Sequence, residues 1–152
     1  MKKLNGVRLK HLKGTAQCQT AALPVPDLVT IPMLMNMGAP CTPLVKVGDA
    51  VKVGQKIGDT DAFMSVPVHS SVSGTVKAVT EIKLANGNTC KAVTIETDGE
   101  QTVSEEVQSP VINSKEEFIK AIRESGITGL GGAGFPTHIK LNPKGEIDTL
   151  II

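Results

Sequence analysis

The residues best suited to chemistry lie in a glycine-rich stretch, GITGLGGAGFPTHIKL, which runs from Gly126 to Leu141. Five glycines fall within residues 126–134, and Phe135, Pro136 and Lys140 follow them. Glycine lacks the Cβ that keeps a ligand away from the backbone, and it leaves successive N–H groups free to converge on an anion. The stretch therefore predicts a loop that holds the phosphate of a nucleotide or a flavin, with Lys140 adding a positive charge.

The glycine spacing from Gly129 to Gly134 also fits G-x-G-x-x-G, the fingerprint of dinucleotide-binding folds. That fingerprint needs a strand directly before it. Residues 114–124 predict a helix instead, because Ser114 and Glu117 form a capping box ahead of apolar residues at helical spacing. We therefore expect a phosphate-binding loop of non-Rossmann type. The alternative interpretation is a packing turn, where one backbone crosses another.

Composition argues against a nucleic-acid-binding surface and against a membrane-embedded chain. Sixteen basic and fifteen acidic residues leave a formal net charge of +1 over 152 residues, too little to steer nucleic acid or anionic lipid. Three phenylalanines, with no Trp or Tyr, offer few rings for base stacking. No apolar run approaches the roughly 18 residues of a membrane span. We expect a soluble chain without direct membrane insertion.

The cysteines and histidines predict neither a metal site nor a catalytic group. Cys18, Cys41 and Cys90 are odd in number and widely spaced, so disulfides, zinc and iron–sulfur sites built from this chain alone are not expected. Reduced, partly buried thiols are the better interpretation. His69, in a strand segment without a visible partner, is expected to be structural. His138 lies four residues beyond Gly134, close enough to face a ligand held by the loop, but the preferred interpretation is that it does not contact the ligand.

The first two thirds of the chain divide into an arm and a β-domain. Residues 1–43 carry five prolines, which predict an irregular arm with at most one strand, near Asp27–Ile31. Residues 44–99 contain short segments with valine at alternate positions, separated by glycine-containing turns. Among these turns, Asn86-Gly87 is a strong hairpin signal. The pattern is typical of a compact all-β domain.

The last third predicts a linker and the beginning of another domain. Residues 100–113 are mostly polar, as in a linker, and residues 114–152 contain the capped helix and the glycine-rich stretch. Pro136 can open a short second helix. Asp148–Ile152 predicts a buried strand. Because this strand stops on three apolar residues, we expect the chain to be the front part of a longer polypeptide.

Residues 44–99 resemble the lipoyl/biotinyl-like barrel-sandwich hybrid fold, a flattened β-sandwich that displays a modifiable lysine on a hairpin. The resemblance rests on four short segments, which are Val47-Gly48-Asp49, Val53–Ile57, Pro67-Val68-His69 and Ser73–Val76. The corresponding hairpin, Asp59–Ser65, contains no lysine. The resemblance thus implies the fold without the carrier chemistry, which leaves a docking module.

The order of the parts resembles the amino-terminal part of the RnfC subunit of the Rnf-type ion-translocating electron transport complex. A lysine-free sandwich, an acidic linker, a capped helix and GxGGAGFPTxxK at Gly129–Lys140 follow one another as in that family. Further matching segments are Gly38-Ala39-Pro40, Val45–Asp49 and Pro67–Gly74. Cobalamin reductases of bacterial microcompartments are similar in the same regions and form the nearest alternative. Residues 15–20 and 61–63 favour the Rnf subunit.

The resemblance implies a mainly β fold with a C-terminal α/β piece, in which the sandwich is followed by the truncated start of an α/β flavin-binding domain. It implies flavin mononucleotide (FMN) and NADH as cofactors. It places six residues of the loop region at these cofactors, namely Gly129, Gly131, Gly132, Gly134, Phe135 and Lys140. The glycines would lie against the flavin phosphate and ribityl chain, Lys140 at the phosphate, and Phe135 at the adenine of NADH. The flavin subunit of respiratory complex I has an arginine where this chain has Leu130.

The function implied is electron transfer between NADH and ferredoxin, within a complex whose other subunits move Na⁺ or H⁺. The subunit would be peripheral, on the cytoplasmic face of the cell membrane, and the isolated fragment would be inactive. Two four-iron four-sulfur clusters would lie in a part of the polypeptide beyond Ile152. A second hypothesis, from another class, is a non-catalytic docking domain whose glycine loop only packs.

Overall fold

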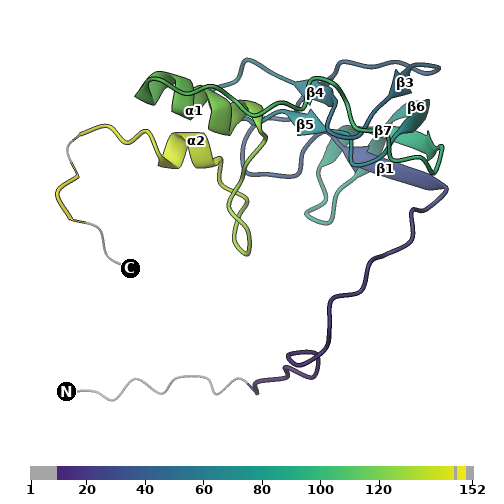
Figure 1. Ribbon diagram of the computed structural model, residues 1–152, viewed down its shortest axis with the longest axis horizontal. Coiled ribbons are helices and arrows are strands. Elements are labelled where there is room, and N and C mark those ends of the chain that lie inside the picture. The colour runs from purple at the N-terminus through teal and green to yellow at the C-terminus, as the bar shows by residue number, and fades with distance from the viewer. Residues whose placement is uncertain (1–9, 146, 150–152) are drawn as a thin grey trace.

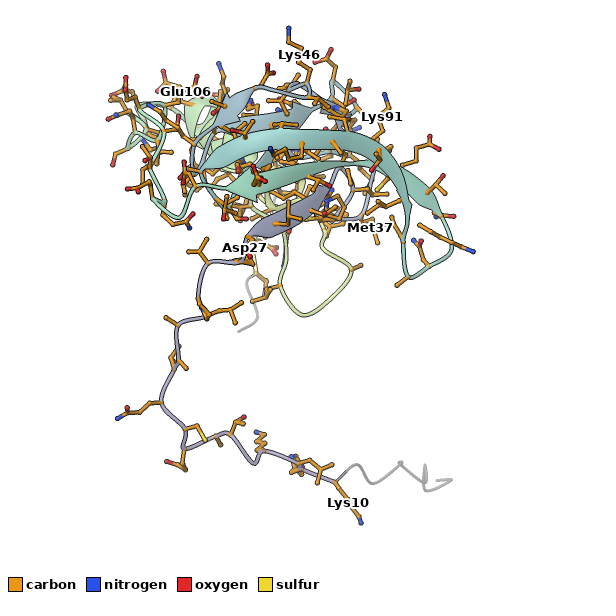
Figure 2. The ribbon with its side chains drawn as sticks, turned by 90° about the vertical axis from the view of Figure 1, so that its right-hand side faces the viewer. Lys10, Asp27, Met37, Lys46, Lys91 and Glu106 are labelled. Atoms are coloured by element: carbon orange, nitrogen blue, oxygen red, sulfur yellow. The ribbon has the colours of Figure 1, made fainter. Side chains whose placement is uncertain are left out.

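The computed structural model describes residues 10–145 and 147–149. Two β-sheets form the body of the chain, and two short helices lie beside them (Figure 1). Residues 10–27 run away from this body as an exposed arm, which Figure 2 shows between the labelled Lys10 and Asp27. The described part of the chain is mainly β, as predicted.

The larger sheet has four strands in the order β1-β7-β6-β3, with every neighbouring pair antiparallel. In that order the strands are β1 (Leu28–Pro32), β7 (Thr89–Thr97), β6 (Gly74–Lys83) and β3 (Ala50–Val51). β6 and β7 form a long hairpin whose turn contains the predicted Asn86-Gly87 pair. Gly87 has φ +88°, a conformation that suits glycine, and the N–H of Leu84 donates to the carbonyl of Asn88 at 2.8 Å.

The smaller sheet has three strands in the order β2-β4-β5. These are β2 (Thr42–Pro43), β4 (Lys56–Asp59) and β5 (Val68–His69). The core between the sheets consists of Ile31, Met33, Cys41, Val51, Ile57, Val68, Val72, Val76, Val93 and Ile95. Alternation explains this set, since Val76 lies opposite Ile95 in the β6–β7 register and both side chains are fully buried.

The sandwich begins before residue 44, where the sequence placed its start. β1 pairs with β7 along its whole length, and β2 pairs with β4. Met33 and Cys41 are buried in the core although both belong to the predicted arm. The prolines do not prevent this, because β1 is an edge strand and Pro32 is its last residue. The strand expected near Asp27–Ile31 corresponds to β1.

The first residues of the predicted linker, 100–113, pair with the sandwich. Val103 forms a parallel bridge with Val53, whose N–H donates to the carbonyl of Thr102 at 2.9 Å. The N–H of Ser104 donates to the carbonyl of Val53 at 2.8 Å, and Ser104 is buried. The first part of this segment therefore extends the β-structure before the chain turns toward the helices.

The capped helix is α1 (Lys115–Glu124), and Ser114 is its N-cap, as predicted. The Ser114 hydroxyl accepts the N–H of Glu117 at 3.1 Å, whereas the Glu117 carboxylate accepts the N–H of Asn113 at 2.6 Å, one residue earlier than in a standard capping box. Gly126, at φ +68°, follows the helix end.

A single helical turn, α2 (Thr137–Lys140), begins after Pro136 and packs beside α1 (Figure 1). The strand expected at 148–152 is not seen at Asp148 and Thr149, which have no regular structure, and residues 150–152 lie outside the described residues. Within the described ranges, neither helix is long and apolar enough to cross a membrane.

Candidate functional site

The glycine-rich stretch forms a closed loop between α1 and α2. Its stem is held by the N–H of Gly129, which donates to the carbonyl of Phe135 at 2.9 Å, and by the N–H of Thr137, which donates to the carbonyl of Ile127 at 3.1 Å. Residues 130–133 form the tip, which projects away from both helices (Figure 1), and Gly134 brings the chain back to the sandwich. Leu130 is fully exposed on this tip.

The backbone of the tip is unusually free to bind a ligand. Within the part of the chain that the structure describes, no backbone N–H from Leu130 to Gly134 donates a hydrogen bond. A Cβ built at Gly131 or Gly132 meets nothing within 4 Å. Gly131 has φ +82°, a backbone conformation that residues with a side chain rarely adopt. A run of unused donors in which Gly131 and Gly132 carry no side chain suits an anion such as a phosphate.

Gly134 differs from Gly131 and Gly132 because it packs against the sandwich. Its φ is +66°, and a Cβ there would lie 3.1 Å from the Cα of Asn36. The N–H of Met37 donates to the carbonyl of Gly134 at 3.1 Å. The alternative interpretation of the stretch as a packing turn therefore fits Gly134, whereas it does not fit Gly131 or Gly132.

The remaining predicted residues follow the loop directly. Phe135 closes the stem and keeps 37% of its surface exposed. Lys140 is exposed at the end of α2, and its ammonium pairs with no carboxylate among residues 10–145 and 147–149. The structure thus brings the four glycines and Phe135 together in one loop, and it places Lys140 one helical turn beyond Pro136.

His138 lies at the contact between the helices. It lines an open pocket of about 370 Å³ with α1 residues that include Ile119 and Arg123. Its Nδ1 atom is buried and has no hydrogen-bond partner in the described chain. Burial, followed by the charge of Arg123, lowers the pKa of His138.

His69 is half-buried in β5 and lines a separate pocket of about 440 Å³. Burial, followed by the charge of Lys56, lowers the pKa of His69. Gly126 packs against it, because a Cβ on Gly126 would lie 3.1 Å from the His69 Nδ1 atom and 2.9 Å from the carbonyl oxygen of Pro67. His69 therefore contacts the turn that leads from α1 into the loop.

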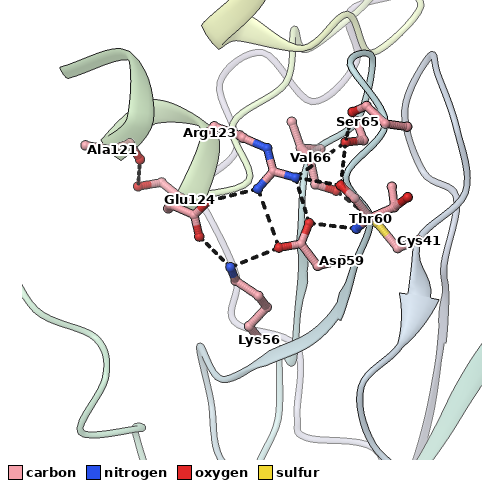
Figure 3. Close-up of polar contacts among 11 residues, drawn as sticks. Cys41, Lys56, Asp59, Thr60, Ser65, Val66, Ala121, Arg123 and Glu124 are labelled. Atoms are coloured by element: carbon pink, nitrogen blue, oxygen red, sulfur yellow. Dashed lines mark hydrogen bonds and ion pairs between the residues drawn. The ribbon is translucent and has the colours of Figure 1, made fainter. Parts of the chain in front are cut away.

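A cluster of four charged residues joins α1 to the smaller sheet, and sequence reasoning missed it. Figure 3 shows Lys56 and Asp59 of β4 facing Arg123 and Glu124 of α1. Arg123 donates to Asp59 at 2.8 Å and to Glu124 at 2.8 Å, and Lys56 donates to Asp59 at 3.1 Å and also to Glu124. We refer to these four residues as the ion-pair cluster.

The cluster also changes the acidity of its members. Burial by itself raises the pKa of Asp59, but hydrogen bonds from Arg123 and Lys56 outweigh it and hold that pKa below its usual value. The same balance of burial against Lys56 and Arg123 lowers the pKa of Glu124. Since both folded-state values are lowered, this stabilisation is present above the ordinary carboxyl pKa and is lost as the pH falls through the lowered values.

The hairpin Asp59–Ser65 closes on itself. The Ser65 hydroxyl donates to the carbonyls of Thr60 at 3.1 Å and Ala62 at 2.6 Å, and Phe63 is exposed at the hairpin's surface. Lys56, the nearest lysine in the sequence, is held by two carboxylates of the cluster. The hairpin therefore presents no free amine.

We expect that no lipoyl or biotinyl group is attached to this chain, because its hairpin offers no amine to a ligase. The intact mass of protein co-expressed with lipoyl and biotinyl ligases and their substrates should equal the unmodified mass. A genuine lipoyl domain expressed in the same cells is the positive control. An added mass that maps to any lysine between residues 44 and 80 contradicts the expectation.

Comparison with known proteins agrees with the observed fold. The family model described as "RnfC Barrel sandwich hybrid domain" matches residues 2–100. A relative from Acetobacterium woodii, a subunit of the Na(+)-translocating ferredoxin:NAD(+) oxidoreductase complex, is 44% identical over 133 residues, which cover 84% of this chain and 30% of the relative. The counterpart from the proton-translocating complex of Clostridium ljungdahlii is 39% identical over 146 residues, covering 92% of this chain and 32% of the relative.

A subunit of the ion-translocating oxidoreductase complex from Rhodobacter capsulatus is 35% identical over 149 residues, covering 94% of this chain and 28% of the relative. The chain therefore spans about a third of the length of the curated relatives it matches. The predicted barrel-sandwich hybrid fold is confirmed, and so is the resemblance on which it rested. The chain belongs to the RnfC family of subunits, which are components of the Rnf-type ion-translocating oxidoreductase complexes.

Proposed function

We propose that the chain works as the amino-terminal part of a subunit that passes electrons between NADH and ferredoxin. Two relatives are named as ferredoxin:NAD(+) oxidoreductase subunits, one Na⁺-translocating and one proton-translocating, which supports electron transfer coupled to ion movement by the other subunits. In this proposal the subunit is peripheral, on the cytoplasmic face of the membrane, and two four-iron four-sulfur clusters belong to a later part of the polypeptide.

The observation that carries the proposal is the unoccupied backbone of the loop tip. Its N–H groups from Leu130 to Gly134 have no acceptor in the described chain, and Gly131 and Gly132 leave open space where side chains would otherwise stand. These features fit the phosphate of FMN, because a dianion is stabilised by converging backbone dipoles and each charge-assisted hydrogen bond contributes about 1.5–3 kcal/mol.

The chain's own residues would bind and orient the cofactors. Bound flavin would supply the hydride and single-electron chemistry. Gly129, Gly131, Gly132 and Gly134 would hold its phosphate and ribityl chain, and Lys140 would add a point charge whose ammonium is not committed to a described carboxylate. The part-exposed ring of Phe135 would offer a stacking surface to the adenine of NADH.

A second candidate is a non-catalytic docking module, and the packing of Gly134 against Asn36 favours it. The two candidates differ in one measurable property, which is specific binding of FMN. Fluorescence quenching of FMN titrated with the full-length subunit tests the first candidate, and NADH-dependent reduction of ferredoxin by the assembled complex tests its activity. A subunit that assembles correctly but binds no flavin supports the docking module.

Substitution of Lys140 with alanine should weaken FMN binding by the full-length subunit without abolishing it. One charge-assisted contact of about 1–3 kcal/mol is lost, which corresponds to roughly a five- to 150-fold decrease in affinity. Fluorescence titration measures the decrease. Lys144→Ala is the matched control, since Lys144 is exposed four residues further on, and it should bind as tightly as the wild type. Equal weakening by both variants would show that only overall charge matters.

The 152-residue chain by itself should bind FMN with an affinity no better than about millimolar and should not oxidise NADH. The reason is that the loop tip projects without other described walls around it. The same titration, run beside the full-length subunit, checks this expectation. Micromolar binding by the short chain would mean that the loop suffices by itself.

A further inference from the structure

We propose that the ion-pair cluster is the joint that holds α1 and the glycine loop in a fixed position on the sandwich, with Arg123 as its central positioning residue. Lys56 and Asp59 provide the sandwich side of this joint, and Arg123 and Glu124 provide the helix side. The mechanical part of this proposal is independent of what the loop binds. Its consequence for flavin rests on the proposed function.

The first argument is that α1 has little else to hold it. None of its residues is buried, and even its largest apolar side chain, Phe118, is 39% exposed. An amphipathic helix is normally fixed by burying its apolar face. Since that contribution is small in the described chain, polar contacts must supply a large part of the attachment.

The second argument is the number of contacts that Arg123 makes across the joint. Its guanidinium reaches both carboxylate oxygens of Asp59, at 2.8 and 3.4 Å, and also donates to the carbonyl of Thr60 at 2.8 Å. It lies 3.5 Å from the hydroxyl of Ser65. These acceptors all belong to the hairpin Asp59–Ser65. A planar fork that meets several fixed acceptors defines an orientation as well as a distance.

The third argument is shielding from solvent. The side chains of Asp59 and Arg123 are each 23% exposed, and Lys56 is 28% exposed. By contrast, the ion pair between Lys77 and Glu96 on the larger sheet has side chains 49% and 54% exposed. Partly buried charges are screened less by salt, and removal of one partner leaves the other without compensation.

The fourth argument is that the glycine loop begins next to the ion-pair cluster. Gly126, two residues after Glu124, lies against Pro67 and His69 of the sandwich, and Gly134 lies against Asn36. The loop is therefore attached to the sandwich at its beginning and at its end. If α1 shifts, the beginning of the loop must shift with it.

The test compares Arg123→Gln and Asp59→Asn with Lys77→Gln in the full chain. Amide hydrogen exchange at the hydrogen-bonded amides of α1 and of the loop stem, such as Ser125, Gly129 and Thr137, should become about tenfold faster or more in the first two variants, as expected for local release. β6 and β7 should keep their wild-type protection. Lys77→Gln, which removes a surface ion pair elsewhere, should change neither region. Arg123→Lys should show a smaller increase than Arg123→Gln, because it keeps the charge without the fork.

Unchanged exchange at the hydrogen-bonded amides of α1 and the loop stem would contradict the proposed joint. An equal increase in β6 and β7 would also contradict it, because that result would indicate general destabilisation. The flavin consequence is read separately, as at least a fivefold loss of FMN affinity in full-length Arg123→Gln. Faster amide exchange with unchanged FMN affinity would support the proposed joint and would contradict its effect on flavin binding. An absence of flavin binding in the wild type would instead be a failure of the proposed function, with the exchange result still deciding the joint.

Discussion

Replacement of Gly132 with valine is expected to abolish FMN retention by the full-length subunit while leaving its melting temperature unchanged. A Cβ at Gly132 meets nothing within 4 Å, and its φ lies outside the range that disfavours side chains. The chain itself therefore tolerates valine, and a substitution at such a surface position changes stability by only about 0.5 kcal/mol. The added side chain instead occupies the space in which the phosphate would approach the loop tip.

The expected loss is large because several hydrogen bonds fail together. Two lost backbone bonds to a phosphate, at about 1.5–3 kcal/mol each, correspond to roughly two to four orders of magnitude in affinity. Fluorescence titration measures the affinity, and thermal unfolding measures the stability. Gly14→Val is the matched control, since Gly14 also has open space around it and lies in the arm. Equal flavin retention by wild type and Gly132→Val would favour the docking module.

Replacement of Gly74 with valine, by contrast, is expected to cause a severe loss of stability. Gly74 is the first residue of β6, where it pairs with Val51 on one side and Thr97 on the other. Its φ is +154°, and a Cβ there would overlap the carbonyl oxygen of Glu96 and lie 2.9 Å from the Cα of Thr97. Both neighbours are backbone atoms of a paired strand, so neither can move without breaking the sheet.

We expect a cost above about 4 kcal/mol for Gly74→Val, which is a large part of the roughly 5–15 kcal/mol that stabilises a domain. Denaturant unfolding measures it. Alanine substitutions separate the two causes: Gly87 has φ +88° and open space, so Gly87→Ala should cost only the backbone strain of about 1–2 kcal/mol. Gly74→Ala should cost clearly more. Similar losses for the two alanine variants would show that crowding at Gly74 is unimportant.

The parts of the fold that the sequence predicted well are those determined by neighbouring residues. The β6–β7 hairpin follows from Asn86-Gly87 between alternating apolar residues, and α1 follows from its cap at Ser114. β2 was missed, because it depends on pairing with the distant strand β4 and not on a local pattern. Proline-rich composition suggested irregular structure where edge strands in fact form.

The same limit applies to the candidate site. The sequence treated the loop glycines as equivalent, whereas the structure separates Gly134, which packs against Asn36, from Gly131 and Gly132, which pack against nothing in the described chain. The ion-pair cluster joins Asp59 to Arg123, residues 64 positions apart. No motif links such positions, so only the folded arrangement reveals the contact.

The distribution of thiols makes the chain suitable for site-specific labelling. Cys41 and Cys90 are buried, whereas Cys18 is exposed in the arm that leaves the sandwich. Burial raises the pKa of the Cys41 thiol, which also donates to the carbonyl of Val66 at 3.1 Å, so it forms little reactive thiolate. A maleimide dye added to the folded 152-residue chain would therefore attach at Cys18 without any engineered cysteine. Its fluorescence anisotropy would then report whether the arm becomes ordered when the complex assembles.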